Sequence, residues 1–353
     1  MRPGPSTEAL AGPVAVGARI DVHLGRTVVA LDVPCEDVQI DWASDRVVPG
    51  KLSYTCPSGW VPASPAAPLN NFGQRSHVVA VLETPAGRDE VDLGWWQHQS
   101  WEEDTSGKVK VECLDLLQLL EQDPMAWPSS PPRGATVLSE AQRLAGTLPV
   151  VLDPGTPNPL VPVSTQWGHS RTEAIRDLCH PRGINWAVKA DGCLHLWAQT
   201  TAHSPVARYT GRDMLVEAPR KSVERRPNRW VTVGSPQQIN DKKPAVKWTG
   251  VAMAASWPYE PSVYGQVTER KEINSADSRA AVQKAALTNM ETALSAASKR
   301  SVEIAPDPRL EAGDVIAVHT DAGEVIVGKV IAYSLPVDKP AGQMRVDMEE
   351  LAW

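Results

Sequence analysis

The chain has 353 residues, of which 42% are hydrophobic and 22% charged, and its formal net charge is −7. This length is enough for two or three domains, and the composition is ordinary for a soluble globular protein. No apolar run is long enough to span a bilayer, and the first residues lack the apolar core of a signal peptide. We therefore expect synthesis in the cytoplasm with reduced thiols. The acidic balance, without a basic stripe, argues against a protein that grips nucleic acid through its phosphates.

Residues 1–126 are predicted to form an N-terminal β domain. Apolar residues alternate with polar ones over several short runs, which is typical of an antiparallel sheet with one buried face. Turn residues such as Pro49-Gly50 separate the runs. This regular spacing favours a barrel or a sandwich. The clearest alternating runs are Ile20, Val22 and Leu24; Val38, Ile40 and Trp42; and Leu52, Tyr54 and Cys56.

Residues 127–134 are rich in proline and are predicted to be a linker. Residues 135–204 are predicted to form an α+β module of two short helices and a hairpin. The second helix begins at a capping box made by Ser170 and Glu173. The hairpin turns at Asp191-Gly192, a strong signal for a tight turn.

Residues 205–353 are predicted to form a C-terminal β domain. Its strands are interrupted by one long Ala-rich helix over residues 276–298. Val282, Ala286 and Met290 lie on one stripe of that helix, together with Ala293 and Ala297. The last predicted strand carries Met344, Val346 and Met348 in alternation. The expected fold class is thus a β-rich, multi-domain α+β protein.

Recognisable catalytic motifs are missing from the sequence, so we expect no enzyme and no catalytic, metal or cofactor residues. Cys179-His180 and Cys193-x-His195 form the one set with zinc-ligand chemistry, but their spacing differs from that of known zinc motifs. We expect Glu102-Glu103-Asp104 to be a solvated turn rather than a cation site. Cys35 and Cys56 lie in separate predicted strands and could pair. The odd total of five cysteines and the cytoplasmic synthesis favour free thiols.

Three stretches in order resemble the baseplate or tail-tip hub proteins of long-tailed bacteriophages, called minor tail proteins in actinobacteriophages, in particular those with siphovirus tails. The resemblance covers about residues 130–350 and, more loosely, the N-terminal β domain. The first stretch runs from Ser170-Arg171 through Glu173-Ala174, Leu178 and Gly183 to Asp191-Gly192-Cys193-Leu194. The second is Pro306-Asp307-Pro308-Arg309-Leu310-Glu311-Ala312-Gly313-Asp314-Val315-Ile316, after the Ala-rich helix. The third is Gln343-Met344-Arg345-Val346-Asp347-Met348.

This resemblance implies two tail-tube-like β-barrel domains beside a smaller α+β domain. It implies a homotrimer whose two barrels per chain imitate a six-fold ring. Such a ring connects the six-fold tail tube, through the distal tail protein, to a three-fold central fibre or spike. Its implied neighbours are the tape measure protein and other minor tail proteins, and phage DNA passes through its lumen without specific binding. The implied location is the tail tip of the virion, with roles in virion assembly and host cell entry.

Two other readings of the sequence remain open. The first is a carbohydrate-binding or receptor-binding tail protein, because Trp95, Trp96 and Trp101 could stack on sugars. The second is a cell-wall hydrolase that uses Cys179 or Cys113 with a histidine. The sequence also contains 13 Trp and only one Phe, so tryptophans and aliphatic residues are expected to fill the core.

Overall fold

The computed structural model describes residues 1–198, 204–219, 226–234, 247–273, 278–297, 299–339 and 341–351. The chain divides into two compact units. The first contains Met1–Ala218 and Ser301–Trp353, and the second contains Pro219–Arg300. The boundaries of the second unit fall inside the domain expected over 205–353. None of the helices formed by the described residues has the length and apolarity that a membrane crossing needs.

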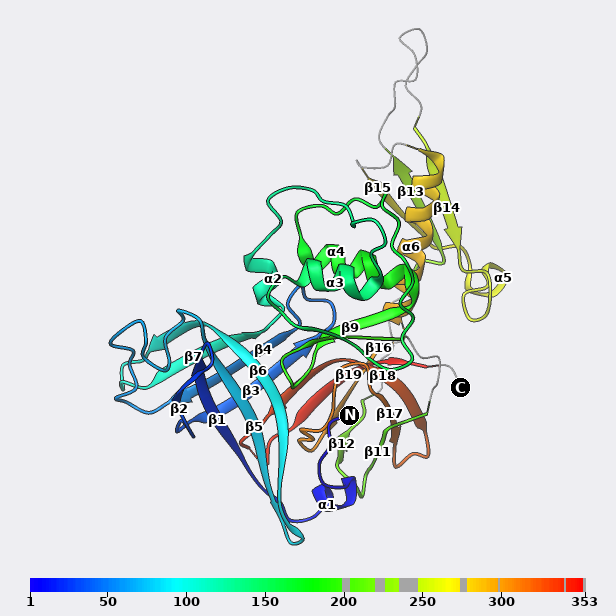
Figure 1. Ribbon diagram of the computed structural model, residues 1–353. Helices are drawn as coiled ribbons and strands as arrows, with labels where there is room; N and C mark the ends of the chain where they lie inside the picture. The colour runs from blue at the N-terminus through cyan, green and yellow to red at the C-terminus, as the bar shows by residue number, and fades with distance from the viewer. Residues whose placement is uncertain are drawn as a thin grey trace. The chain divides into compact units, whose positions relative to one another are not determined.

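The first unit is built on a 13-stranded sheet whose strands come from both ends of the chain (Figure 1). Its main path runs in the order β12-β16-β19-β18-β3-β4-β7-β6-β5-β1-β2, and β11 and β17 branch from β18. The short helix α1 (Thr7–Ala11) precedes the first strand. The strands are β1 (Ala15–Leu24), β2 (Thr27–Ala30), β3 (Glu36–Ala43), β4 (Gly50–Cys56), β5 (Gln74–Thr84), β6 (Gly87–Glu103), β7 (Val109–Asp115), β11 (Ala207–Thr210), β12 (Leu215–Glu217), β16 (Lys299–Ile304), β17 (Val315–His319), β18 (Val325–Pro336) and β19 (Met344–Glu350).

Strand β18 joins the two halves of this sheet. Its first half pairs with β17, and its second half pairs antiparallel with β3, from Ala332 opposite Ala43 to Pro336 opposite Gln39. The side chain of Gln39 donates a 2.8 Å hydrogen bond to Ser334 Oγ at this junction. Residues about 300 positions apart thus share one ladder and one hydrophobic core.

The topology of the large sheet differs from the two β-barrels that the sequence predicted. None of the sheets formed by the described residues closes as a barrel. The physical reason is that β3 and β18 satisfy each other's backbone groups. Each half therefore continues into the other half instead of returning to its own first strand.

A smaller α+β module is part of the same unit. Its sheet has the order β8-β10-β9, and helices α3 and α4 lie side by side over it (Figure 1). Thr136 and Ser139 form a capping box at α3, whereas at α4 Ser170 Oγ accepts from the amide of Glu173. The elements are α2 (Gln118–Gln122), α3 (Val137–Ala145), β8 (Val150–Leu152), α4 (Arg171–Cys179), the 3-10 turn η1 (His180–Arg182), β9 (Ile184–Val188) and β10 (Leu194–Ala198).

The predicted linker over 127–134 contains no helix or strand element, and Arg133 is exposed. The segment is nevertheless attached to the module, because the amide of Trp167 donates a 2.9 Å hydrogen bond to the Ser129 carbonyl. The buried indole of Trp167 belongs to the module core.

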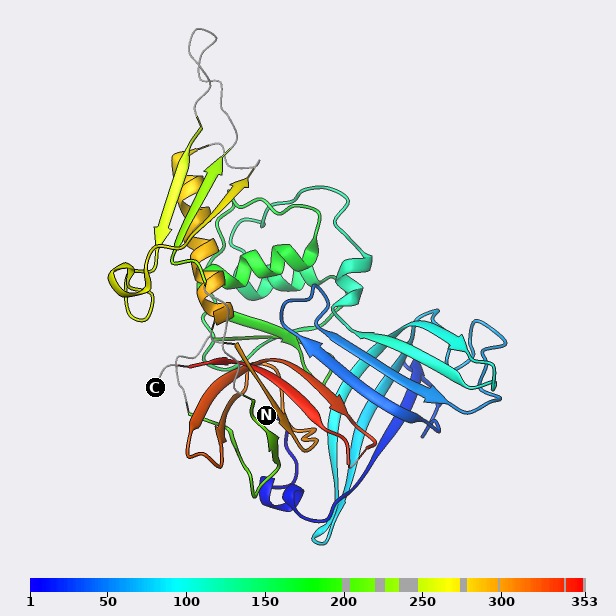
Figure 2. The same ribbon diagram turned by 180° about the vertical axis from the view of Figure 1, so that it is seen from behind.

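The second unit is a three-stranded sheet, β14-β13-β15, with helix α6 packed along β13 and β14 (Figure 2). Val282 and Ala286 of α6 are fully buried. A Cβ atom at Gly250 of β14 would lie 2.4 Å from the Val282 carbonyl oxygen, so only glycine permits this close approach. The elements are β13 (Arg229–Gly234), β14 (Thr249–Met253), α5 (Pro261–Tyr264), β15 (Thr268–Ile273) and α6 (Arg279–Ala297). Of the helix expected over 276–298, residues 276, 277 and 298 lie outside the described residues.

We predict that Ala286→Trp destabilises the second unit by about 3 kcal/mol, because the new indole has no space between α6 and the sheet. Leu287→Trp is the matched control, since Leu287 is the next residue of the same helix and is 41% exposed. Native-state hydrogen exchange of the β13 and β14 amides in the full chain measures the effect. Equal protection in both variants would show that α6 does not pack as described.

Candidate functional site

The cysteine and histidine set considered for zinc is not assembled. Cys179 is fully buried at the end of α4, and His180 is exposed in the following turn. Cys193 and His195 lie on the hairpin. Among the residues that the structure describes, no group of three or more His, Cys, Asp or Glu side chains is placed to hold a metal ion.

His195 instead takes part in a small network of charges on the module surface. Its Nδ1 lies 2.6 Å from Asp153 and its Nε2 lies 2.9 Å from Asp191. Lys189 also contacts Asp153, at 2.7 Å. These partners hold the pKa of both aspartates below the usual range, against a desolvation effect that raises it. The network fixes the Asp191-Gly192 turn to the loop after β8.

Of the acidic run at 102–104, Glu102 and Glu103 end strand β6, and Asp104 lies in the turn that follows. Asp104 accepts bonds from the Ser106 amide at 2.7 Å and the Lys108 amide at 3.0 Å. The Ser106 hydroxyl donates a further bond to the same carboxylate, and these bonds lower the pKa of Asp104. Asp104 therefore shapes its own hairpin turn, whereas the turn expected from the sequence also included Glu102 and Glu103, which lie in β6.

The three tryptophans proposed as a sugar-stacking surface do not form one. Trp96 is buried, and its indole nitrogen donates to the Leu93 carbonyl. Trp101 is partly buried against the core of the large sheet. Trp95 stacks on His77 with ring centroids 4.6 Å apart and lies against Gly192 of the module. Packing within the protein thus accounts for the buried Trp96, whereas Trp95 and Trp101 are half-buried.

The cysteines proposed as hydrolase nucleophiles are also in the wrong environment. Cys113 and Cys179 are both buried. Burial raises the pKa of the Cys179 thiol to about 12 and that of Cys113 well above its usual value. A nucleophilic cysteine needs an accessible thiolate, which these two positions do not provide.

A serine and histidine pair that the sequence analysis missed lies inside the large sheet. Ser76 Oγ and His98 Nε2 are 2.8 Å apart, and the Tyr54 hydroxyl lies 3.0 Å from Ser76. His98 Nδ1 lies 3.0 Å from the Asn70 carbonyl, which can only accept. Nδ1 is therefore the donor, and Ser76 donates to Nε2. All three side chains are at most 2% exposed, so the pair is structural and no substrate reaches it. The sequence feature that could have identified this pair is the presence of polar residues at strand positions whose side chains face the core.

A buried ion pair lies in the loop between β16 and β17. Arg309 contacts Asp307 in a bidentate manner, with Nε–Oδ1 at 2.9 Å and Nη2–Oδ2 at 2.7 Å. The Tyr209 hydroxyl donates to the same carboxylate at 3.0 Å. Asp307 is fully buried and Arg309 is 6% exposed. Such a pair is tolerated because every charged oxygen has a donor.

The same loop holds the N-terminal segment. Arg309 donates from Nη2 to Thr7 Oγ1 at 3.0 Å and from Nη1 to the Pro5 carbonyl. Arg2 donates from its side chain to the Leu310 carbonyl at 2.7 Å, and its amide donates to the Arg309 carbonyl. The Pro306–Ile316 stretch carries part of the family resemblance. It thus connects the N-terminal segment of the chain to the C-terminal part of the first unit.

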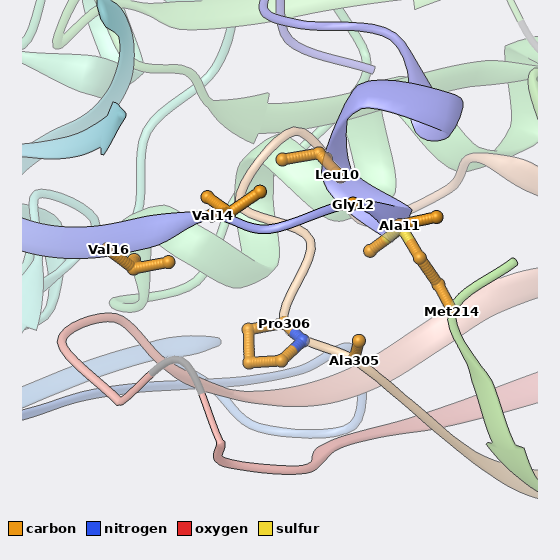
Figure 3. A pocket seen from close by; sticks show the side chains of 8 residues that line it. All are labelled: Leu10, Ala11, Gly12, Val14, Val16, Met214, Ala305 and Pro306. Carbon is orange, nitrogen blue, oxygen red and sulfur yellow. The ribbon is translucent and has the colours of Figure 1, made fainter. Parts of the chain in front are cut away.

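One cavity of about 200 Å³ lies beside α1 (Figure 3). Its lining contains no acid, base or nucleophile, so it offers no catalytic chemistry. It is lined by Leu10, Ala11, Gly12, Val14, Val16, Met214, Ala305 and Pro306.

We predict that the unfolding free energy depends on pH through His98. Burial lowers the pKa of His98 from 6.5 to about 4. The unfolded chain therefore binds a proton between pH 6.5 and 4 that the folded chain does not. This contribution to stability is present above pH 6.5 and is lost as the pH falls to 4, by about 3 kcal/mol.

His98→Gln, which retains a donor for the Asn70 carbonyl, tests this prediction. The free energy of unfolding of the variant and of the native chain is measured by urea unfolding at each pH. The contributions of other titrating groups cancel in the difference between the two. The stability difference between them should shrink as the pH falls from 7 to 4. A difference independent of pH would contradict the assignment.

We also predict that Arg309→Met lowers the stability of the first unit by about 3–5 kcal/mol, because Asp307 would be left as a buried charge without its cation. Arg345→Met is the matched control. Arg345 contacts Asp347 at 3.1 Å, but its side chain is 62% exposed, so its loss should cost at most about 1 kcal/mol. Urea unfolding distinguishes them, and equal losses would refute the role given to the buried pair.

Comparison with known proteins gives a consistent result for the fold. No protein-family model matches the chain, and no curated protein matches it significantly. Solved structures do match over nearly the whole chain. A tail protein from Neisseria meningitidis MC58 aligns with a TM-score of 0.62 and 16% identity over 95% of this chain and 97% of its own. The 43 kDa tail protein of prophage MuSo2 from Shewanella oneidensis aligns with a TM-score of 0.60 and 10% identity, over 94% and 98%.

A third match has a lower TM-score. The prophage tail protein gp18 from Listeria monocytogenes aligns with a TM-score of 0.52 and 8% identity, over 95% of this chain and 94% of its own. At these identities the likeness concerns the fold. The chain has the fold of phage tail proteins.

Proposed function

We propose that the protein is a structural component of a phage tail, the hub ring at the tail tip. The observation that carries this proposal is the fold likeness, which extends over 94–95% of the chain and nearly all of two tail proteins, one of them from a prophage. An alignment of this extent includes the large sheet, the module and the second unit together. Shared ancestry of one motif would give a shorter match.

The large sheet supports the ring part of the proposal. Strands from both ends of the chain form two halves of one sheet, joined by β3 and β18. If each half occupies one of six equivalent places, three chains complete a ring that meets a six-fold tube. The distal tail protein and tape measure protein would then lie on the tube side, and a three-fold fibre or spike on the other.

The charge of the chain suits a channel that DNA crosses. The net charge of −7 offers no excess of cations to retain phosphates. The catalytic motifs expected of a lytic enzyme are missing from the sequence, and the cysteines considered for that role are buried. The proposal therefore assigns assembly, and not catalysis, to this protein in the virion.

Imaging of assembled tails by electron microscopy tests the proposal. We expect three copies of this chain in one ring at the tip, with the large sheet facing the lumen. A tag fused to the chain should appear as extra density at that ring and nowhere along the tube. Six copies per ring, or tag density on the outer wall of the tube, would refute the hub assignment.

A further inference from the structure

Two of the five cysteines lie at the adjoining ends of two paired strands. Strands β3 and β4 pair antiparallel, with Glu36 opposite Thr55. Cys35 immediately precedes β3 and Cys56 is the last residue of β4, so one further step in the same register would bring Cys35 opposite Cys56. Directly opposite residues of an antiparallel pair have Cα atoms about 4.5–5.5 Å apart, which is within the range that a disulfide spans.

The two side chains also point to the same side of the sheet. Side chains alternate along a strand, so Cys35 and Cys56 share the face opposite to Glu36 and Thr55. Both pack in the core of the first unit, where Cys56 is fully buried and Cys35 is partly exposed. Burial is the main cause of the raised pKa of Cys56, and a charge on Cys35 raises this pKa further.

We propose that Cys35 and Cys56 are an oxidisable pair, which a small-molecule disulfide converts into a cross-strand disulfide. The Cys35 thiolate attacks one sulfur of the reagent, forms a mixed disulfide and releases the first thiol. The Cys56 thiolate then attacks the Cys35 sulfur and releases the second thiol. The two protein sulfurs are oxidised, the reagent is reduced, and the two thiol protons end on the released thiols.

Both thiols remain reduced where the chain is synthesised, and the bond forms when the protein reaches an oxidising medium. Burial raises the pKa of Cys35 and of Cys56 to about 12. Thiolate is therefore scarce, and the reaction is slow at neutral pH. Its rate should rise about tenfold per pH unit between pH 7 and 9. The bond closes the loop 36–55 and raises the melting temperature by about 5 °C.

The test exposes the full chain to oxidised glutathione at pH 7, 8 and 9, in a Cys193→Ser background. This background removes the other partly exposed thiol. Peptide mapping without reductant should show Cys35 linked to Cys56, while Cys113 and Cys179 stay free. The melting temperature should rise in step with the linked fraction and return after reduction.

Single variants supply the controls. Cys35→Ser and Cys56→Ser should each abolish the rise in melting temperature. Cys113→Ser, a buried cysteine of the same sheet opposite Leu52, should leave it unchanged. A stable glutathione adduct on Cys35, or linkage of either cysteine to a second chain, would overturn the proposal. So would the absence of any linked peptide at pH 9 after complete reaction of a denatured control. The test does not depend on the role in the tail.

Discussion

The pairing of β3 with β18 is the interaction on which the first unit depends. It connects residues near position 40 with residues near position 335 in one antiparallel ladder. Without it, the seven N-terminal strands and the C-terminal strands would be two sheets, each with a long unpaired edge. The hydrophobic core of the large sheet contains residues from both halves because this ladder holds them together.

Ion pairs and hydrogen bonds then hold the loops and strands of the two halves in place. The buried Asp307–Arg309 pair orders the loop after β16, and that loop holds the N-terminal segment. Inside the N-terminal half, Tyr54, Ser76 and His98 satisfy one another across separate strands. Polar groups in this core are thus used for specificity of packing, because a buried polar group without a partner is costly.

Local features were predictable from the sequence, whereas pairings between distant strands were not. Alternation identified β1, β3 and β4, and the Asp-Gly signal located the turn between β9 and β10. Two closed barrels were the wrong inference, because periodicity reports which face is buried and not which strand is the neighbour. The burial of Trp96 could not be predicted for a similar reason. An aromatic residue in a strand can face solvent or core, and only the register decides.

The β3–β18 junction also has a consequence for the order of folding. During synthesis, β3 is complete long before β18, so its edge waits unpaired while about 290 further residues are added. Asp41 accepts a hydrogen bond from Ser334 in the finished ladder. Before that, Asp37 and Asp41 give the waiting strand two negative charges, since the cation that Asp37 contacts is Lys339 of the C-terminal part. Charged edges resist pairing with other chains. We therefore expect these acidic residues of β3 to disfavour pairing with other chains until its own C-terminal strand is made.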